Sequence, residues 1–319
     1  MKALGKLFAG LAMACLATAL QAQAYPTKPI KLIVPFAPGG GTDILGRTAA
    51  RIMGAGLGQT IIVENRPGAS GTVGLDGLVA SAPDGYTLML LATSTAVAHH
   101  FLGREFNFSK LMVPIGNIIT TQMMLAVGPK KIDAKSFAEL VAYLKANPGT
   151  DYSTSGPGSP GELGMAGWAR QMKISVTHVP YKGINPAVTD VIAGRVGMII
   201  IDATSAKSHV DSNAIRPLAI LGAKRLSYAS GTPITVELGY PDFAIEIYAG
   251  LVAPAGTPSV AVERLRKASQ ELVVNEEYLG AFRQTGLPEY IDGPAWATAI
   301  QRQYDQWGVV IKEAGIKPN

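Results

Sequence analysis

Cysteine is nearly absent from the sequence. The single cysteine among its 319 residues is Cys15, which lies in an uncharged N-terminal stretch. If this stretch is removed after Ala24, the remaining chain has no cysteine, so disulfides, thiol catalysis and thiolate metal sites are excluded together. Such a composition also suits a compartment in which stray thiols would be oxidised.

No hydrophobic run in the sequence reaches the roughly 18 residues that a membrane-spanning helix needs. An uncharged run, 7–20, is preceded by Lys2 and Lys6 and followed by small residues at 22–24. This order predicts a secretory signal peptide over 1–24, so we expect an exported chain. The alternative is a lipoprotein modified at Cys15, but residues 12–14 lack the leucine three places upstream that such sites usually carry.

Charge is also sparse. Charged residues make up 16% of the chain, with 28 Lys and Arg against 23 Asp and Glu. They are scattered, and the sequence has no basic cluster of the kind that binds nucleic acid or anionic membranes. We therefore expect no nucleic-acid partner, and the mild positive charge suits an acidic ligand.

Candidate catalytic residues are few. The four histidines are His99, His100, His178 and His209. Their spacing matches neither HExxH nor a comparable metal-binding pattern. The sequence has no Gly-x-Ser-x-Gly elbow, and Pro160 directly after Ser159 removes an N–H that an oxyanion hole would use. We predict no metal, no cofactor and no enzyme; the alternative is an exported hydrolase or isomerase that depends on His178 or Ser159.

Runs typical of strands alternate with apolar residues at helical spacing. Strands are predicted at 30–36, 60–64, 86–91, 152–155, 174–181, 196–201, 215–221 and 248–253, and helices from 42, at 75–82, at 137–146, from 185, at 260–274 and at 296–311. N-cap preferences place helix starts at Thr42-Asp43, at Ser136 with Glu139, and at Asn185 before Pro186. The alternation implies an α/β fold in which helices cover both faces of a parallel sheet.

The order of elements also predicts the domains. A second unit begins near Gly128, and the two last helices are expected to pack back on the first unit. The first domain would then be discontinuous, comprising 25–126 and 248–319, and the second would comprise 127–247. Two connections between domains suit a clamp that closes on a ligand.

The loop 38–43 is the sharpest candidate for a binding site. It follows a strand, contains three glycines and leads into a helix, so backbone N–H groups and the positive end of the helix dipole meet there. Thr42-Asp43 excludes a Walker phosphate loop, and Ile44 excludes the dinucleotide fingerprint. The alternative is a tight turn without a ligand. Loops 67–72 and 156–161 have the same design, and each of them is also compatible with an ordinary turn.

Several longer segments together resemble one known family. They are 25–30 (YPTKPI), 32–43 (LIVPFAPGGGTD), 63–69 (VENRPGA), 82–88 (APDGYTL), 179–183 (VPYKG), 215–220 (IRPLAI) and 253–258 (APAGTP). In this order they are similar to the Bug family, the periplasmic receptors of tripartite tricarboxylate transporters. The resemblance spans essentially the whole chain after the signal peptide.

The resemblance implies a two-lobed periplasmic-binding-protein (Venus flytrap) fold, with two parallel-type sheets flanked by helices and a ligand cleft between the lobes. It implies a periplasmic receptor for a small carboxylate: a mono- or dicarboxylate, aromatic or an amino acid. The ligand-binding positions would be Phe36, Ala37, Gly40, Gly41, Thr42, Asp43, Thr93, Ser94, Thr95, Thr154, Ser155, Gly158, Ser159, Tyr181, Lys182, Gly183 and Asp202. The partner would be membrane transporter subunits or, alternatively, a sensor kinase, and we expect a monomer.

The chain departs from the family pattern at positions that concern the ligand. Ala37 stands where the family usually has proline, Glu162 where it commonly has histidine, and Gly197 where it often has aspartate. None of these changes removes the loop 38–43. They do mean that the ligand of a relative cannot be copied to this chain.

Overall fold

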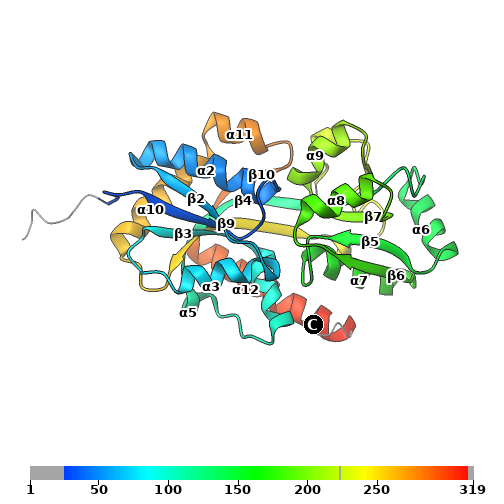
Figure 1. The fold of residues 1–319 in the computed structure, drawn as a ribbon, viewed down its shortest axis with the longest axis horizontal. Helices are drawn as coiled ribbons and strands as arrows, with labels where there is room; N and C mark the ends of the chain where they lie inside the picture. Colours follow the sequence, from blue (N-terminus) through cyan, green and yellow to red (C-terminus); the bar gives the residue numbers. More distant parts are fainter. Residues whose placement is uncertain (1–24, 223, 315–319) are drawn as a thin grey trace, which may run out of the picture.

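The computed structural model describes residues 25–222 and 224–314, so the predicted signal peptide and Cys15 lie outside the described residues (Figure 1). The elements are β1 (Ile30–Val34), α2 (Gly41–Leu57), β2 (Ile61–Asn65), η1 (Ala69–Gly71), α3 (Thr72–Val79), β3 (Thr87–Ala92), α4 (Thr93–Val97), η2 (Ala98–Leu102), α5 (Phe108–Leu111), β4 (Met112–Val127), α6 (Phe137–Ala146), β5 (Thr150–Thr154), α7 (Pro160–Met172), β6 (Val176–Pro180), α8 (Ile184–Ile192), β7 (Met198–Asp202), α9 (Ala203–Asp211), β8 (Arg216–Leu221), η3 (Ser227–Ala229), η4 (Pro241–Phe243), β9 (Glu246–Pro254), α10 (Ser259–Val273), α11 (Glu276–Phe282), β10 (Gly286–Asp292) and α12 (Gly293–Ala314).

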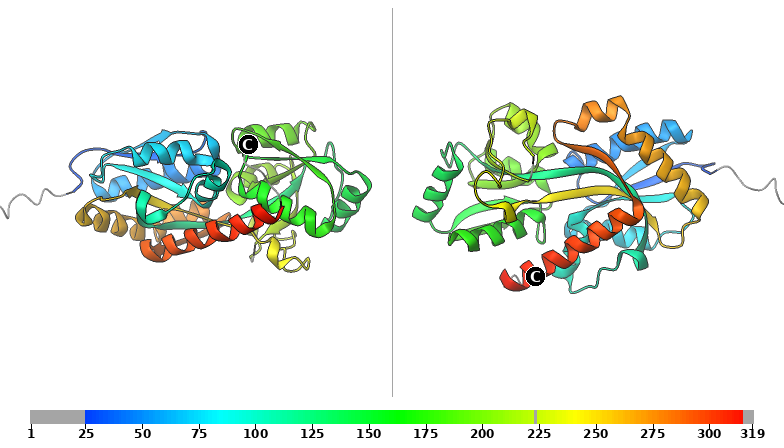
Figure 2. Two further views of the ribbon diagram at one scale, coloured as in Figure 1. Left: turned by 90° about the horizontal axis from the view of Figure 1, so that it is seen from below. Right: turned by 180° about the vertical axis from the view of Figure 1, so that it is seen from behind.

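The strands follow the order β2-β1-β3-β9-β4-β7-β5-β6, and both β8 and β10 pair with β4. We call the half that contains β1, β2, β3 and β10 the first lobe and the half that contains β5 to β8 the second lobe. Strands β4 and β9 run side by side between the lobes (Figure 2). Pairing is parallel within β2-β1-β3 and within β6-β5-β7, whereas β9 and β4 are antiparallel to their neighbours, so the sheet is mixed rather than wholly parallel.

The 16-residue strand β4 joins the two lobes and was not predicted from the sequence. Up to Gln122 it pairs with β9, and from Met123 it pairs with β7 and β8. Most of its residues are buried because both of its faces are covered, so it lacks the alternating pattern of a half-exposed strand. Its change of partner precedes the predicted domain boundary at 126, and the division of the chain into domains stays a prediction.

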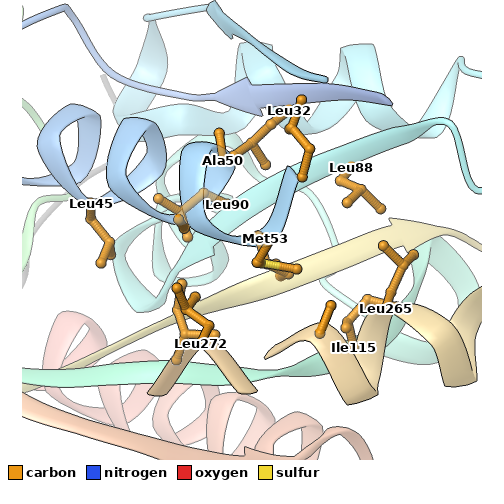
Figure 3. Packing of buried hydrophobic residues seen from close by; sticks show 14 of the residues in the cluster. Leu32, Leu45, Ala50, Met53, Leu88, Leu90, Ile115, Leu265 and Leu272 are labelled. Atoms are coloured by element: carbon orange, nitrogen blue, oxygen red, sulfur yellow. The ribbon is translucent and has the colours of Figure 1, made fainter. Parts of the chain in front are cut away.

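The core of the first lobe lies between α2, α10 and the sheet (Figure 3). Leu45, Ala49 and Met53 of α2 recur at helical spacing, and all three are buried. They share one hydrophobic cluster with Leu265 and Leu272 of α10. Burial of each large side chain contributes about 1.5–3 kcal/mol, so this cluster fixes α2 on the sheet.

The second lobe has its own core around Trp168 of α7. Trp168 is buried, and its ring stacks on Phe243 with centroids 5.3 Å apart. The C-terminal helix α12 leaves the first lobe and packs against α7 (Figure 2). There Trp307 joins a small cluster with Phe101 and Leu163, so α12 provides a third connection between the lobes.

The structure corrects two predicted helix starts. Helix α2 begins at Gly41 with Gly40 at the N-cap, so Thr42 and Asp43 lie in its first turn rather than before it. Helix α8 begins at Ile184 after Gly183, whose φ of 129° marks an abrupt change of direction that favours glycine. In both cases a glycine takes the position before the helix, and no side chain of the N-cap residue covers the first amides.

The Ser136 cap is confirmed, because its hydroxyl accepts a 3.2 Å hydrogen bond from the amide of Glu139. The segment 93–95, which the resemblance assigns to ligand binding, forms the first turn of α4. The chain therefore passes from β3 into α4 without a loop.

Candidate functional site

A cavity of about 100 Å³ lies between the lobes. This is well above the roughly 10–15 Å³ that one water molecule requires, so it has room for a small organic molecule. Its walls come from both lobes and from β4 and β9. The lining residues are Phe36, Ala37, Gly40, Gly41, Thr42, Leu45, Ala92, Ser94, Ile119, Thr121, Met123, Ser155, Pro160, Gly183, Ile184, Asn185, Asp202, Thr204, Ile247, Ala249 and Phe282.

Direct contacts between the lobes close one side of this cavity. The amide of Gly41 donates a 2.8 Å hydrogen bond to the hydroxyl of Ser205. The side-chain amide of Asn185 donates to the carbonyl oxygen of Pro38 at 3.1 Å. Both bonds join the start of α2 in the first lobe to a helix of the second lobe. The two lobes are therefore in direct contact beside the cavity.

Three described residues at or just before the start of α2 line the cavity and have unpaired amides. Ala37, Gly40 and Thr42 all line it, and within the described residues their backbone N–H groups donate to no protein acceptor. The positive end of the 17-residue helix points to the same place. Backbone donors combined with a helix dipole form a site for an anion.

Asp43 holds this loop from behind instead of lining the cavity. Its buried carboxylate accepts hydrogen bonds from the amide of Gly39 at 2.9 Å, from Arg47 Nε at 2.9 Å and from Asn65 Nδ2 at 2.8 Å. Asn65 Nδ2 also donates to the carbonyl oxygen of Phe36 at 3.0 Å. Burial by itself would raise the pKa of Asp43, but the hydrogen bonds from Arg47, Gly39 and Asn65 lower it below its usual range. Asp43 is therefore an ionised anchor for the loop 36–43.

Asp202 faces the start of α2 from the second lobe. Its Oδ1 accepts a 2.8 Å hydrogen bond from the amide of Ser205 and so caps α9. Burial raises the pKa of Asp202, because the site between the lobes is poorly solvated. A Cβ atom on Gly41 would lie 2.5 Å from this oxygen, which is closer than a real contact allows. Only glycine at position 41 therefore permits this approach of the lobes.

Thr154, His178 and Glu162 form a chain of contacts outside the cavity wall. The Thr154 hydroxyl lies 2.7 Å from His178 Nε2, and His178 Nδ1 lies 3.0 Å from Glu162 Oε1. Glu162 Oε2 accepts a 2.6 Å hydrogen bond from the amide of Gly158. The order of groups is that of a nucleophile, a base and an acid. Thr154 is fully buried, however, and the chain of contacts holds the loop 155–159 in place.

Ser159 is also used structurally. Its hydroxyl accepts a hydrogen bond from the amide of Glu162 at 3.4 Å and caps α7. Only 2% of the residue is exposed. The two residues on which the hydrolase alternative depends, His178 and Ser159, therefore both support the loop 155–159.

The structure places the predicted ligand-binding residues in two groups. Those that line the cavity are Phe36, Ala37, Gly40, Gly41, Thr42, Ser94, Ser155, Gly183 and Asp202. Those that lie outside its wall are Asp43, Thr93, Thr95, Thr154, Gly158, Ser159, Tyr181 and Lys182. Contact of either group with a ligand stays a prediction.

The residues outside the wall are engaged elsewhere or point away. The Thr93 hydroxyl accepts from the amide of Tyr248 at 3.1 Å. Thr95 is fully buried in α4, and the Tyr181 hydroxyl donates to Asp190 Oδ2 at 2.6 Å. Gly158 lies against the ring of Phe101. The side chain of Lys182 is exposed.

Residues of β4 and β9 form a wall of the cavity that we call its floor, and none of them was predicted to bind a ligand. Ile119, Thr121 and Met123 of β4 and Ile247 and Ala249 of β9 alternate along their strands, so each set lies on one strand face. Other wall residues that were not predicted are Leu45, Ala92, Pro160, Ile184, Asn185 and Phe282. The floor residues of β4 could be predicted only if β4 were first recognised as a strand, because their alternation then places them on one face.

Within residues 25–222 and 224–314, no group of three His, Cys, Asp or Glu side chains is arranged to hold a metal ion. In the same residues, every helix is too short or too polar to cross a membrane.

A family model described as "Tripartite tricarboxylate transporter family receptor" matches residues 45–316. The chain belongs to this receptor family. Its members are solute-binding receptors rather than enzymes, which agrees with the resemblance in the sequence. Protein BugT of Bordetella pertussis is 33% identical to this member over 313 residues, covering 96% of this chain and 95% of BugT.

Solved structures of similar proteins have the same fold. The periplasmic binding protein BugD aligns with a TM-score of 0.85 at 27% identity, covering 92% of this chain and 99% of BugD. Rhodopseudomonas palustris MatC with bound malate has a TM-score of 0.83 at 25% identity, covering 90% and 100%. R. palustris Rpa4515 with adipate has a TM-score of 0.87 at 27% identity, covering 92% and 100%. The predicted two-lobed fold class is confirmed.

Proposed function

We propose that this receptor captures a small carboxylate in the periplasm and presents it to the membrane subunits of a tripartite tricarboxylate-type transporter. The unpaired amides of Ala37, Gly40 and Thr42 on the cavity wall carry this proposal. A carboxylate can accept hydrogen bonds from these amides and interacts favourably with the α2 dipole. The adipate and malate bound to Rpa4515 and MatC are small carboxylates, which supports the same ligand class for this chain.

The strength of such a site is sufficient for capture. Each hydrogen bond to a charged group contributes about 1.5–3 kcal/mol. Three of them contribute about 4.5–9 kcal/mol, which offsets association costs of several kcal/mol, so burial of the rest of the ligand must supply most of the roughly 8 kcal/mol of a micromolar site. The ligand would also touch both lobes, so it favours the closed state by its additional contacts there.

In this function, two domains would move relative to each other when the ligand binds. We assign 25–126 with 248–319 to one domain and 127–247 to the other, with β4 and β9 as the connections. The ligand carboxylate would lie on the residues of the first group, from Phe36 to Thr42, with Ser94. Ser155, Gly183 and Asp202 would close over it from the second lobe. The closed form is then what the transporter subunits recognise.

A thermal-shift experiment tests the ligand class. Mature protein is freed of any co-purified ligand by partial unfolding and dialysis, and is then heated with a panel of mono-, di- and tricarboxylates. At least one carboxylate should raise the Tm, and the rise should grow with the logarithm of its concentration above the Kd, whereas its amide should not raise the Tm. A flat response across the whole panel would contradict the proposal.

A further inference from the structure

The turn 68–71, which follows β2 in the first lobe, has an uncommon backbone conformation. Its φ angles are 138° at Gly68, 44° at Ala69, 52° at Ser70 and 97° at Gly71. This left-handed region suits glycine but is unfavourable for a residue with a side chain, and two of the four residues carry one. Such conformations persist where the surrounding structure determines them, and they gather at functional sites. The fold therefore holds Ser70 against its own backbone preference.

Contacts within the first lobe fix this turn. The hydroxyl of Thr72 donates to the carbonyl oxygen of Ala69 at 3.0 Å. A Cβ atom on Gly71 would lie 2.5 Å from Thr95 Oγ1, so the turn packs closely on the first turn of α4. Neither contact involves the second lobe, so the first lobe alone holds Ser70 in place.

Ser70 reaches the second lobe through its hydroxyl. Its Oγ donates a 2.5 Å hydrogen bond to the carbonyl oxygen of Pro157, which lies in the loop 155–159 between β5 and α7. A Cβ atom on the neighbouring Gly156 would lie 3.9 Å from the same hydroxyl. This contact between the lobes is separate from the two at the start of α2, because it begins at η1.

The loop that accepts this hydrogen bond is also held in place. The amide of Gly158 donates to Glu162 Oε2 at 2.6 Å. Donor and acceptor are thus fixed on their own lobes, so little conformational freedom is lost when they meet. Ser155 at the start of this loop lines the cavity, whereas Ser70 is not among the lining residues. Ser70 is therefore placed to affect the lobes rather than to touch a ligand.

We propose that Ser70 is a latch residue: its hydrogen bond to Pro157 holds the two lobes together beside the cavity and so retains the ligand without touching it. This inference rests on the proposed function, because it takes the lobes to close on a ligand. A hydrogen bond between neutral groups corresponds to about a two- to tenfold change in affinity. Because the bond is the same whatever the cavity holds, its loss should weaken the binding of different ligands by one common factor.

Two variants of Ser70 separate the latch from the backbone strain. Ser70→Ala and Ser70→Gly both remove the hydroxyl, but glycine adopts the left-handed backbone more readily. Ser70→Gly should therefore have a higher Tm than Ser70→Ala, whereas both should lose the latch to the same extent. The matched control is Ser81→Ala, because Ser81 donates to the carbonyl oxygen of Gly77 at 2.8 Å within the first lobe.

Distances between two spin labels test the latch whether or not a ligand binds. The chain from residue 25 onward has no cysteine, so Ile44→Cys in α2 and Thr189→Cys in α8 place one label at an exposed position on each lobe. Both Ser70 variants should shift the distribution of distances towards longer separations, and Ser81→Ala should not. Distributions equal to that of the wild type overturn the inference.

Calorimetry with malate and adipate, the molecules bound to MatC and Rpa4515, gives the dependence on ligand. Each Ser70 variant should bind both molecules about two- to tenfold more weakly than Ser81→Ala does, and by the same factor. Different factors for malate and adipate would mean that Ser70 reads the ligand itself, which overturns the inference. If neither molecule binds to the wild type, that result counts against the proposed function, and the distances between labels still decide on the latch.

Discussion

Gly41 donates its backbone hydrogen to the hydroxyl of Ser205, 2.8 Å away on the opposite lobe. The first amide of α2 is thus used to close the clamp, while the amides of Ala37, Gly40 and Thr42 stay free for a ligand. In the function proposed above, closure and ligand capture would therefore occur at the same helix start.

Replacing Gly41 by alanine should hold the lobes apart. A Cβ atom at this position would lie 2.5 Å from Asp202 Oδ1 and 3.1 Å from Ser205 Oγ, both in the second lobe. Alanine is favourable within a helix, so the first lobe should stay folded. We expect at least a tenfold loss of ligand affinity and a larger radius of gyration by X-ray scattering in the presence of ligand.

Gly56→Ala is the matched control for this variant. It lies in the same helix, and its added Cβ would meet only Glu271 Oε2, at 3.8 Å. Its affinity and radius of gyration should equal those of the wild type. If Gly41→Ala closes as fully as Gly56→Ala does, the closure contact has been misidentified.

Removing one of the free amides should weaken the anion site. Ala37→Pro deletes the N–H of a residue that lines the cavity, and this N–H has no protein partner within the described residues. The loss of one hydrogen bond to a charged group should reduce affinity by about 1.5–3 kcal/mol, or about ten- to a hundredfold. Ala37→Ser keeps the amide and serves as the control in the same calorimetric titration. Equal affinity of the two variants would exclude this amide from the site.

Asp43 should make stability depend on acid pH. A carboxyl whose pKa is lower in the folded state stabilises the fold above its unfolded value near about 3.9, and this contribution is lost as the pH falls through the folded pKa. Urea unfolding of the wild type should therefore show a falling free energy below about pH 4. Asp43→Asn should be less stable at pH 7 and show a flatter pH dependence.

A surface carboxylate provides the comparison. Asp76 pairs with Arg104 at 3.0 Å, but both side chains are more than half exposed. Such pairs contribute about 0–1 kcal/mol, so Asp76→Asn should keep the wild-type pH dependence. Identical profiles for Asp43→Asn and Asp76→Asn would rule out the role of Asp43 as an ionised anchor.

Glu162 should hold the loop 155–159. Glu162→Ala removes the acceptor for the amide of Gly158 and the partner of His178, so we expect a loss of about 1–3 kcal/mol of unfolding free energy. Hydrogen exchange of the amides in 156–158 should become faster. Glu162→Gln keeps a side-chain oxygen for Gly158 and should restore slow exchange. If both variants exchange like the wild type, the loop is fixed by other contacts.

The cavity wall formed by residues 36–42 could be predicted from the sequence, because the pattern that marks it lies within a few consecutive residues. The strand before Ala37, the glycines at 39–41 and the helix after them are all visible within a short window. Asp202 was found through the family resemblance. Asp43 was assigned to ligand binding, although its partner Asn65 comes from a different strand, and that contact shows only after folding.

The floor of the cavity was not predictable in the same way. Ile119 and Met123 belong to a strand whose burial is nearly continuous, so no periodic pattern marks the face that meets the cavity. Ile247 comes to lie beside Thr121 only through the pairing of β4 with β9, more than a hundred residues apart in the chain. Long-range pairing of this kind leaves no trace in local composition.

A crystal structure of the receptor with its best-binding carboxylate tests the central claim most directly. We predict that carboxylate oxygens lie within about 2.7–3.2 Å of the backbone nitrogens of Gly40 and Thr42, directly or through one ordered water. The body of the ligand should rest on Ile119, Met123 and Ile247. A carboxylate bound away from the start of α2, with these amides facing only solvent, would contradict the account.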